Sequence, residues 1–388
     1  MTDLLSDLNT ITAEMLTPMV RSALRRGDVD IAEWHYEAFG HSLDEVYGQE
    51  RSIIRFSGTA LERDRQDRSV PWALVLKIVT TPGTPDDSTC PDNGDRESLA
   101  YTSGLLHGLR GLRTPRCFGV MERPSACAWL WLEDIVDEIG REWPAERYSL
   151  AARHLAQFNA AYPASRGDLS HAWLSRSPLR NIVSEVSGAV ERVFDMLGNP
   201  FVAQAISPVS AAALVALLRD SAAWLDALDR VPQALCHWDA HRANLFSRTA
   251  EDGGIETVAI DWAGVGWGAV GSDLSRLLST TVNFFGMHVD TLPALDGALF
   301  EQYLEGLRES GWEGDHRIVR FGYTATSAIR LLDRTAKALH LASDVQARGA
   351  FERAAGLPFG SIAEKFRLTL PHYLSHADEA RRLANLVS

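Results

Sequence analysis

Hydrophobic and polar residues follow two different patterns along this chain, and the change comes near residue 132. Apolar side chains recur at near-helical spacing in residues 3–26, which predicts an amphipathic helix. After residue 34 come short β-branched or aromatic runs, separated by clusters of Gly, Pro, Asp and Ser. Such runs predict strands, here at 51–56, 72–79, 116–121 and 127–132, with one helix between them at 96–106.

Beyond residue 132 the pattern is mainly helical. The spacing predicts a strand pair near 245–261 and helices at 148–162, 184–197, 209–228, 273–282, 292–310, 316–340 and 360–374. A sheet-rich first third followed by a helix-rich remainder predicts an α+β protein of two lobes. We expect an N-terminal helix at 1–29, a sheet lobe at 30–134 and a helical lobe at 135–388.

Composition narrows the possible functions. The 388 residues carry 38 Lys+Arg against 51 Asp+Glu, a net charge of −13, which disfavours a nucleic-acid partner because phosphate binding needs clustered cations. The four cysteines form no C-x-x-C pair, which indicates a reducing compartment. The first 16 residues lack a signal-peptide pattern, and the longest apolar run, 211–218, is too short for a membrane helix. We therefore expect a cytoplasmic protein without a membrane partner.

The most informative stretch is LCHWDAHRANLF, residues 235–246, which contains the pattern H-x-D-x-x-x-x-N at His237, Asp239 and Asn244. An apolar run ends in Asp261, and the turn signal EDGG lies between the two segments. In a hairpin centred on that turn, Asn244 and Asp261 face each other at the open end. An amide oxygen and a carboxylate placed so predict a Mg²⁺ site, which leaves Asp239 to accept a hydroxyl proton. Taken singly, Asn244 also suits a turn and Asp261 a helix cap.

A second candidate pair lies in the sheet-rich part. Lys77 interrupts the apolar strand WALVLKIV and shares a face with apolar residues, so its ammonium needs an anionic partner. Glu97 begins the helix that follows, on a small and semi-apolar face that suits packing against a sheet. A Lys77–Glu97 pair would place the ammonium for phosphate oxygens. The alternative is a lysine reaching solvent and a glutamate that only favours the helix dipole.

Lys77, Glu97, the HWDAHRAN motif and Asp261 come in the order and rough spacing of a known group of enzymes. The chain resembles the aminoglycoside phosphotransferase and choline-kinase-like families, which are small-molecule relatives of protein kinases. The resemblance covers roughly residues 30–340. It implies a bilobal protein-kinase-like fold with a small antiparallel-sheet N-lobe, one key helix, and a larger, mainly helical C-lobe.

The resemblance also implies roles for individual residues. Asp239 is expected to be the catalytic carboxylate, His237 to brace its loop, and Asn244 and Asp261 to bind Mg²⁺. Lys77 is expected to contact the phosphates of ATP or GTP and to pair with Glu97. The backbone of Glu133, Asp134 and Ile135 is expected to bind the purine, and Gly40 and Ser42 are candidates for the phosphate-covering loop. No activation-loop signature follows Asp261, which favours a small-molecule kinase over a protein kinase.

The acceptor is expected to be a hydroxyl of an antibiotic or related natural product, with choline-like or sugar acceptors as alternatives, and the enzyme a monomer or homodimer. In this family the C-terminal helices shape the acceptor site, and acidic residues there often meet cationic antibiotics. The available acidic residues, most of them typical of a solvated face, are Glu301, Glu305, Glu309, Glu313, Asp315 and Asp333.

Rival functions remain. His237, Asp239 and His241 could line one strand face as zinc ligands of a hydrolase. The glycines of GVGWGAVG, residues 264–271, match a dinucleotide fingerprint, but a flexible link before a helix suits them better. A binding-only pseudoenzyme is disfavoured, because binding alone would not need Asp239.

Overall fold

The computed structural model describes residues 8–38, 52–63, 65–80, 94–123, 127–165, 171–284 and 287–387. Two compact units divide the chain: Met1–Pro85 with Pro115–Ile135, and Asp86–Thr114 with Val136–Ser388. Helix α3 (Gly94–Thr102) is grouped with the second unit, whereas the predicted lobe at 30–134 contains it. The predicted domain boundaries stay a prediction.

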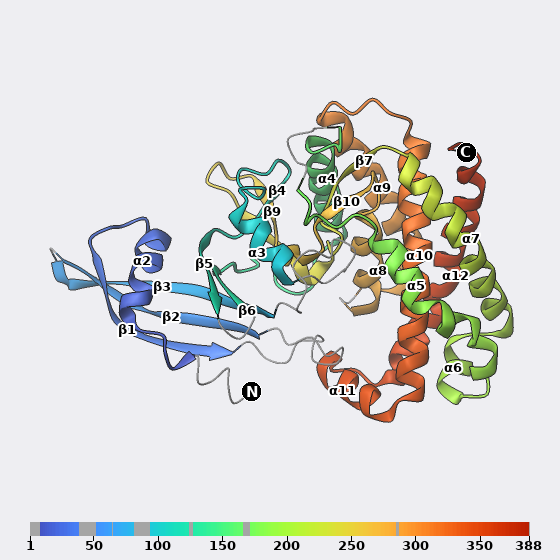
Figure 1. Ribbon diagram of the computed structural model, residues 1–388, viewed down its shortest axis with the longest axis horizontal. Coiled ribbons are helices and arrows are strands. Elements are labelled where there is room, and N and C mark those ends of the chain that lie inside the picture. Colours follow the sequence, from blue (N-terminus) through green and yellow to red (C-terminus); the bar gives the residue numbers. More distant parts are fainter. Residues whose placement is uncertain are drawn as a thin grey trace. The chain divides into compact units, whose positions relative to one another are not determined.

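The described part of the first unit is a five-stranded antiparallel sheet on which helix α2 packs (Figure 1). The strand order is β1-β2-β3-β6-β5, and helix α2 spans Ala13–Leu24. The strands are β1 (Val29–Ala38), β2 (Ser52–Glu62), β3 (Arg65–Thr80), β5 (Cys117–Arg123) and β6 (Cys127–Glu133). Alternating residues of β3, Leu74 and Leu76, are fully buried and form one core with Leu16 of α2 and Trp131 of β6. Apolar residues at every second strand position thus meet the apolar stripe of the helix.

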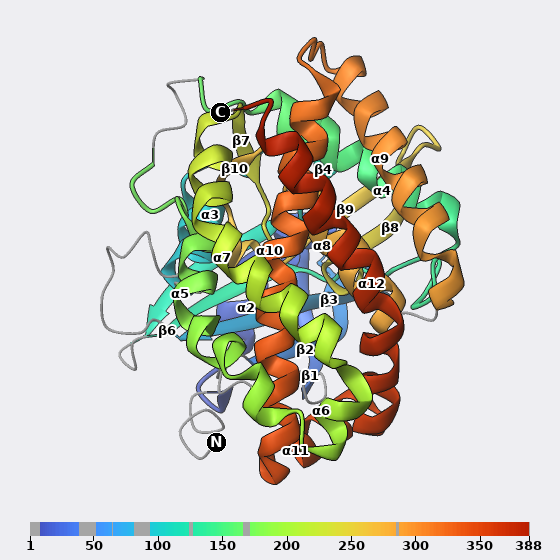
Figure 2. The ribbon, with the colours of Figure 1, turned by 90° about the vertical axis from the view of Figure 1, so that its right-hand side faces the viewer.

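The second unit is mainly helical. Its longer helices are α4 (Ala145–Ala161), α5 (Pro178–Glu191), α7 (Pro208–Arg230), α8 (Leu274–Phe284), α9 (Leu292–Glu309), α10 (His316–Ser343), α11 (Val345–Ala355) and α12 (Phe359–Ala384); α6 (Pro200–Ala205) is short. Helix α10 is buried along most of its length and contacts α5, α7, α8, α11 and α12 (Figure 2). The predicted α+β class, with an antiparallel-sheet part and a larger helical part, is confirmed.

Two small sheets lie within this second unit. Strands β7 (Gln233–Cys236) and β10 (Gly266–Ala269) pair antiparallel, while β4 (Leu112–Arg113), β9 (Ile255–Ala259) and β8 (Leu245–Thr249) form a three-stranded sheet. Among the described helices, none combines the length and the apolar character that a membrane crossing requires.

The glycine-rich stretch 264–271 is neither a flexible link nor a dinucleotide fingerprint, because it forms strand β10 in an antiparallel pair. Its glycines permit close packing. A Cβ on Gly266 would lie 2.1 Å from the carbonyl oxygen of Ser175, and one on Gly268 would lie 2.4 Å from Cζ2 of Trp238. The glycines therefore let β10 lie directly against the segment before α5 at Ser175 and against the loop that follows β7 at Trp238.

Candidate active site

The loop after β7 carries the H-x-D-x-x-x-x-N motif and is held at its backbone by one buried carboxylate. Asp273, just before α8, accepts hydrogen bonds from the backbone N–H of His237 (2.9 Å) and of Trp238 (2.8 Å). The amide of Asn159 on α4 donates to the same carboxylate at 3.0 Å. The carbonyl of Trp238 accepts from the buried guanidinium of Arg330 on α10 at 2.7 Å. These contacts hold the backbone of Trp238 in the left-handed region, at φ 65°. They therefore also fix the direction of the chain at the next residue, Asp239.

His237 contacts both the motif loop and the segment before Asp261. Its Nδ1 accepts from the backbone N–H of Asp239 (3.2 Å), and its Nε2 lies 2.9 Å from the carbonyl oxygen of Ile260. These partners require a neutral ring with the proton on Nε2. The ring is fully buried against Trp262. His237 thus ties the motif loop to the segment that leads into Asp261.

Asp239 is the charged centre of this arrangement. The guanidinium of Arg276 on α8 donates from Nε (2.8 Å) and from Nη2 to Oδ1. The amide of Asn244 donates to Oδ2 at 2.9 Å, and Nε2 of His241 lies 3.4 Å from the same oxygen. Burial opposes ionisation, but Arg276 and His241 outweigh it and hold the pKa of Asp239 well below its ordinary value. Asp239 is therefore a carboxylate throughout the neutral range.

Asn244 is oriented by the same contacts. Its amide nitrogen donates to Oδ2 and to the backbone carbonyl of Asp239, the latter at 3.0 Å. Both donations come from the nitrogen, so the Oδ1 oxygen of Asn244 remains available as a ligand atom.

The hairpin exists, but its predicted register is wrong by one residue. The ladder pairs Leu245 with Ala259 and Thr249 with Ile255, so Asn244 lies opposite Ile260 and accepts from its backbone N–H at 3.0 Å. The loop has five residues, 250–254, and closes through Gly253 in the left-handed region at φ 85°. A loop with an odd number of residues is centred on one residue, here Asp252. The prediction placed the centre between two residues, which shifts the pairing by one residue.

Asp261 follows directly after Ile260 and is not part of the β8–β9 pairing. Its backbone is left-handed, at φ 61° and ψ 69°, so the strand alternation no longer decides where its side chain points. The carbonyl of Ile260 is bound by His237 and its N–H by Asn244. The backbone entering Asp261 is therefore fixed by two residues of the motif loop.

Helix α3 packs on the turn after Asp261, in the second unit. Glu97 accepts from the backbone N–H of Trp262 at 3.3 Å, and Arg96 donates to the carbonyl of Ala263 at 2.8 Å. Both side chains are almost completely buried. Glu97 thus helps to fix the segment beyond Asp261, a role that the sequence did not suggest. Its predicted pairing with Lys77 stays a prediction, since the two residues belong to different units.

The remaining predicted residues lie in the first unit or outside the described residues. Lys77 is on β3, opposite Leu130 of β6, and is 6% exposed. The backbone N–H of Glu133 already donates to the carbonyl of Arg116 at 2.8 Å, so that group is not free for a purine. Asp134 pairs with Arg55 at 2.8 Å. Roles of Glu133, Asp134 and Ile135 in binding a purine stay predictions, and Gly40 and Ser42 lie outside the described residues.

Asp273, Arg276 and Asn159 were not expected at the site from the sequence. Asn159 is fully buried, and it also donates to the carbonyl of Leu235 and accepts from Tyr303. A polar residue at a core position of the apolar helix HLAQFNAAY was the available signal. Asp273 stands just before a predicted helix, where an aspartate commonly caps the helix, and nothing in the sequence distinguishes that role from the one observed.

The predicted zinc alternative is not supported by the geometry. Both ring nitrogens of His237 have hydrogen-bond partners, and Nδ1 of His241 accepts from the backbone N–H of Ala243 at 3.2 Å. Over the described parts of the chain, three residues other than these, Asp296, His372 and His376, are placed to share a metal ion.

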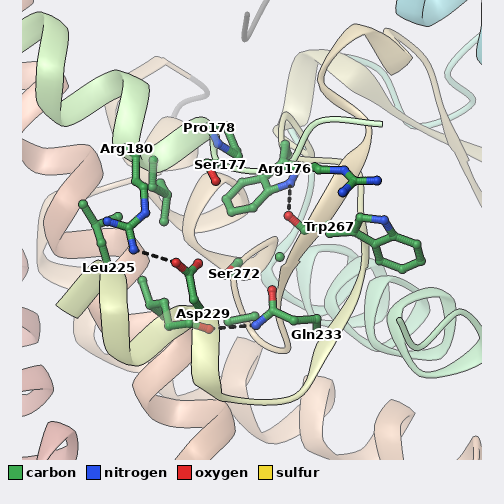
Figure 3. A pocket seen from close by; sticks show the side chains of 14 residues that line it. Arg176, Ser177, Pro178, Arg180, Leu225, Asp229, Gln233, Trp267 and Ser272 are labelled. Atoms are coloured by element: carbon green, nitrogen blue, oxygen red, sulfur yellow. Dashed lines mark hydrogen bonds and ion pairs between the residues drawn. The ribbon is translucent and has the colours of Figure 1, made fainter. Parts of the chain in front are cut away.

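A small hollow of about 30 Å³ borders the motif loop at Trp238, and Figure 3 shows the side chains that line it. Its walls come from the start of α5, the end of α7 and strand β10. On one wall Arg180 pairs with Asp229 at 2.6 Å, and on another the indole N–H of Trp238 donates to the carbonyl of Trp267. The hydrogen bond from Trp238 thus holds the motif loop against β10.

Residues 197–315 match the family model described as the phosphotransferase enzyme family, APH. This match confirms the predicted resemblance. It also confirms the predicted enzyme class, a kinase with a hydroxyl acceptor. The matched phosphotransferase segment contains the motif loop, Asp261, Asp273 and Arg276.

Solved structures of several small-molecule kinases are similar to this chain. An ethanolamine kinase of Plasmodium vivax is 11% identical with a TM-score of 0.48, covering 85% of this chain and 83% of its own. Aminoglycoside 2′-phosphotransferase-IIIa in its GDP complex is 14% identical with a TM-score of 0.49, covering 89% and 99%. A spectinomycin phosphotransferase bound to ADP and spectinomycin is 13% identical with a TM-score of 0.47, covering 92% and 99%. No curated protein matches the chain.

Proposed function

We propose that this phosphotransferase moves the γ-phosphoryl group of ATP or GTP to a hydroxyl group of an antibiotic or a related natural product, and that it uses Mg²⁺. The observation that carries the proposal is the ionised Asp239 carboxylate on a loop whose backbone is bound by Asp273 and Arg330. Phosphoryl transfer leaves little covalent work to the protein, so positioning and charge supply most of the rate. A braced carboxylate beside an oriented amide suits that task.

Asp239 acts mainly by orienting the acceptor hydroxyl. A carboxylate offers about four lone-pair positions, of which Arg276 and the Asn244 amide occupy three. The fourth position faces His241, whose 3.4 Å separation makes it the weakest partner. An acceptor hydroxyl would take this place and donate its proton toward Oδ2. Because the pKa of Asp239 is lowered, the group holds the hydroxyl in line and takes the proton only as the bond to phosphorus forms.

Asn244 and Asp261 fit a hard divalent cation. Asn244 presents a neutral amide oxygen, Asp261 a carboxylate, and Mg²⁺ prefers such oxygen ligands with its remaining positions filled by water and phosphate. When bound, Mg²⁺ would neutralise the charge of the triphosphate. Lys77 is the further cation that we propose for the phosphates.

The charges around Asp239 favour a neutral or anionic acceptor over a polycation. Arg276 contacts Asp239 directly, and Arg330 binds the residue before it. Several acidic residues of the C-terminal helices are engaged elsewhere. Among these, Glu309 pairs with Arg153, Asp315 with Arg317, and Asp333 with Lys337. A polycationic aminoglycoside would therefore meet like charge next to the reacting hydroxyl. A choline-type acceptor is disfavoured on the same ground, whereas a sugar-type acceptor remains the second candidate.

The test is a nucleoside-diphosphate-release assay with ATP and GTP against neutral, acidic and polycationic hydroxylated antibiotics, amino alcohols and sugars. We expect Mg²⁺-dependent turnover with a neutral or acidic acceptor. Calorimetry should show that Asp261→Asn abolishes Mg²⁺-dependent nucleotide binding, while Asp226→Asn at an exposed ion pair leaves it intact. Equal nucleotide binding by the Asp261→Asn variant with and without Mg²⁺, at native affinity, would remove Asp261 from the metal site.

A further inference from the structure

A second cluster of metal-ligating side chains lies in the second unit, on helices α9 and α12. His372 and His376 are four residues apart on α12 and therefore share one helix face, and Asp296 comes from α9. Helix α12 packs against both α9 and α10 (Figure 2). None of these residues takes part in the proposed phosphoryl transfer.

The three side chains converge on one point. Oδ2 of Asp296 lies 2.9 Å from Nε2 of His376 and 3.3 Å from Nε2 of His372, and the three ligand atoms lie within 4.8 Å of one another. Ligands about 2.0–2.2 Å from a tetrahedral Zn²⁺ lie about 3.3–3.6 Å apart. The two separations between the Asp296 oxygen and the imidazole nitrogens are close to that size.

His372 supplies a second observation. Its Nε2 is buried and has no well-formed hydrogen bond among the described groups, although it lies 3.3 Å from Oδ2. A buried polar atom without a hydrogen bond is costly, and a metal ion at this point would satisfy it.

The carboxylate of Asp296 has the supporting contacts typical of a metal ligand. Its Oδ1 accepts from the hydroxyl of Tyr323 at 2.7 Å and from Nη1 of Arg320 at 3.2 Å. The other guanidinium nitrogen of Arg320, Nη2, is 3.4 Å from Oδ2 and 2.8 Å from Glu379. One oxygen is thus held by fixed donors while the other faces the two imidazoles, an arrangement that orients carboxylate ligands in metal sites.

The charges around the cluster also suit a cation. The carboxylates of Asp296 and Glu379 share one guanidinium, that of Arg320, which lies 3.2 Å from Asp296 and 2.8 Å from Glu379. Apart from the two imidazoles, these three groups carry one net negative charge.

We propose that Asp296, His372 and His376 bind one Zn²⁺ ion, which joins α9 to α12. Two imidazole nitrogens and one carboxylate oxygen are ligands that select zinc over magnesium. A water molecule would supply the fourth ligand of the tetrahedron. The site stabilises the helical unit independently of catalysis.

The experiment uses Co²⁺ as a visible probe on the full-length protein after treatment with a chelator. We expect one equivalent to bind with the intense absorption of tetrahedral cobalt, Zn²⁺ to displace it, and millimolar Mg²⁺ to leave it unchanged. His372→Gln should weaken binding by at least about 100-fold, and Tyr323→Phe, which removes a supporting contact, by about 10–100-fold. The control is His316→Gln, an exposed histidine on α10, which should bind as the native protein does.

Circular dichroism checks that each variant is folded. Native cobalt affinity in a folded His372→Gln variant overturns the proposal, and so does the lack of a stoichiometric tetrahedral band in the native protein. Should His372→Gln fail to fold, Tyr323→Phe decides, since it removes one buried hydroxyl and no ligand. Unchanged affinity in that variant overturns the proposal as well.

Discussion

Replacing Asp273 by Asn should disable the motif loop, although the residue touches no reactant. Asp273 is 1% exposed and accepts three hydrogen bonds, two of them from the backbone N–H groups of His237 and Trp238. An asparagine oxygen in place of Oδ2 keeps the bonds from His237 and Asn159. Its NH₂ group then faces the N–H of Trp238, so one charge-assisted bond is lost and a buried donor is left without a partner.

The magnitude follows from these contacts. A hydrogen bond to a charged group contributes about 1.5–3 kcal/mol and an orphaned buried donor costs about 1–3 kcal/mol, partly offset because the neutral amide is easier to bury. We expect the free energy of unfolding in urea to fall by about 2–4 kcal/mol. Turnover should fall by about 100-fold even in the folded enzyme, because a displacement of about 1 Å at a reacting group costs that much.

The matched control is Asp226→Asn, which removes a carboxylate from an exposed pair with Arg180. Such pairs contribute at most about 1 kcal/mol, so stability and turnover should change little. The reasoning about the loop is refuted if Asp273→Asn unfolds within about 0.5 kcal/mol of the native protein and keeps its turnover.

Three further predictions concern the same unit. Asp239→Asn should lower turnover by about 10²–10⁴-fold with nucleotide affinity retained, and near-native turnover in the diphosphate-release assay would exclude its proposed role. Arg276→Gln removes the cation that lowers the pKa of Asp239, so the carboxylate protonates at higher pH. The acid limb of the kcat/KM profile should then move to higher pH, and an unmoved limb would contradict the assignment. Gly266→Ala should destabilise the protein by about 1–3 kcal/mol, because its Cβ meets the carbonyl of Ser175. Gly188→Ala, on a helix with open space around it, should instead be stabilising by up to about 1 kcal/mol in the same urea titration.

Local pattern predicted most of the elements in both units. The strands that became β2, β3, β5 and β6 were visible as apolar runs, and so were most long helices. Strand β1 was not predicted, because it lies at the sheet edge, where only its first residue, Val29, is buried and most of the others are exposed. Helix α11 was not predicted for a similar reason. Phe351 is its one buried residue, so the helix has no pronounced apolar face.

The candidate site was predictable only where its residues are close in sequence. The spacing of the motif identifies His237, Asp239 and Asn244, and the hairpin is recognisable from its turn. The register was not predictable, because the number of loop residues depends on the backbone conformation of Gly253. The motif loop is contacted by Asp273 and Arg276, and the segment after Asp261 is contacted by Glu97. These contacts join residues that are 35 to 165 positions apart in the sequence, and no spacing rule predicts them.

Two of the three described non-glycine residues with positive φ are Trp238, which directly precedes Asp239, and Asp261, which directly follows the hairpin. A left-handed conformation costs a side-chain-bearing residue about 1–2 kcal/mol, and a tryptophan or aspartate keeps it only where surrounding contacts enforce it. A chain selected for folding alone would place glycine at both positions. On warming, this loop should therefore lose its structure before the surrounding helices unfold. Activity should then be lost at a lower temperature than helical ellipticity. The two residues with left-handed backbone would in that case limit the temperature at which the enzyme works.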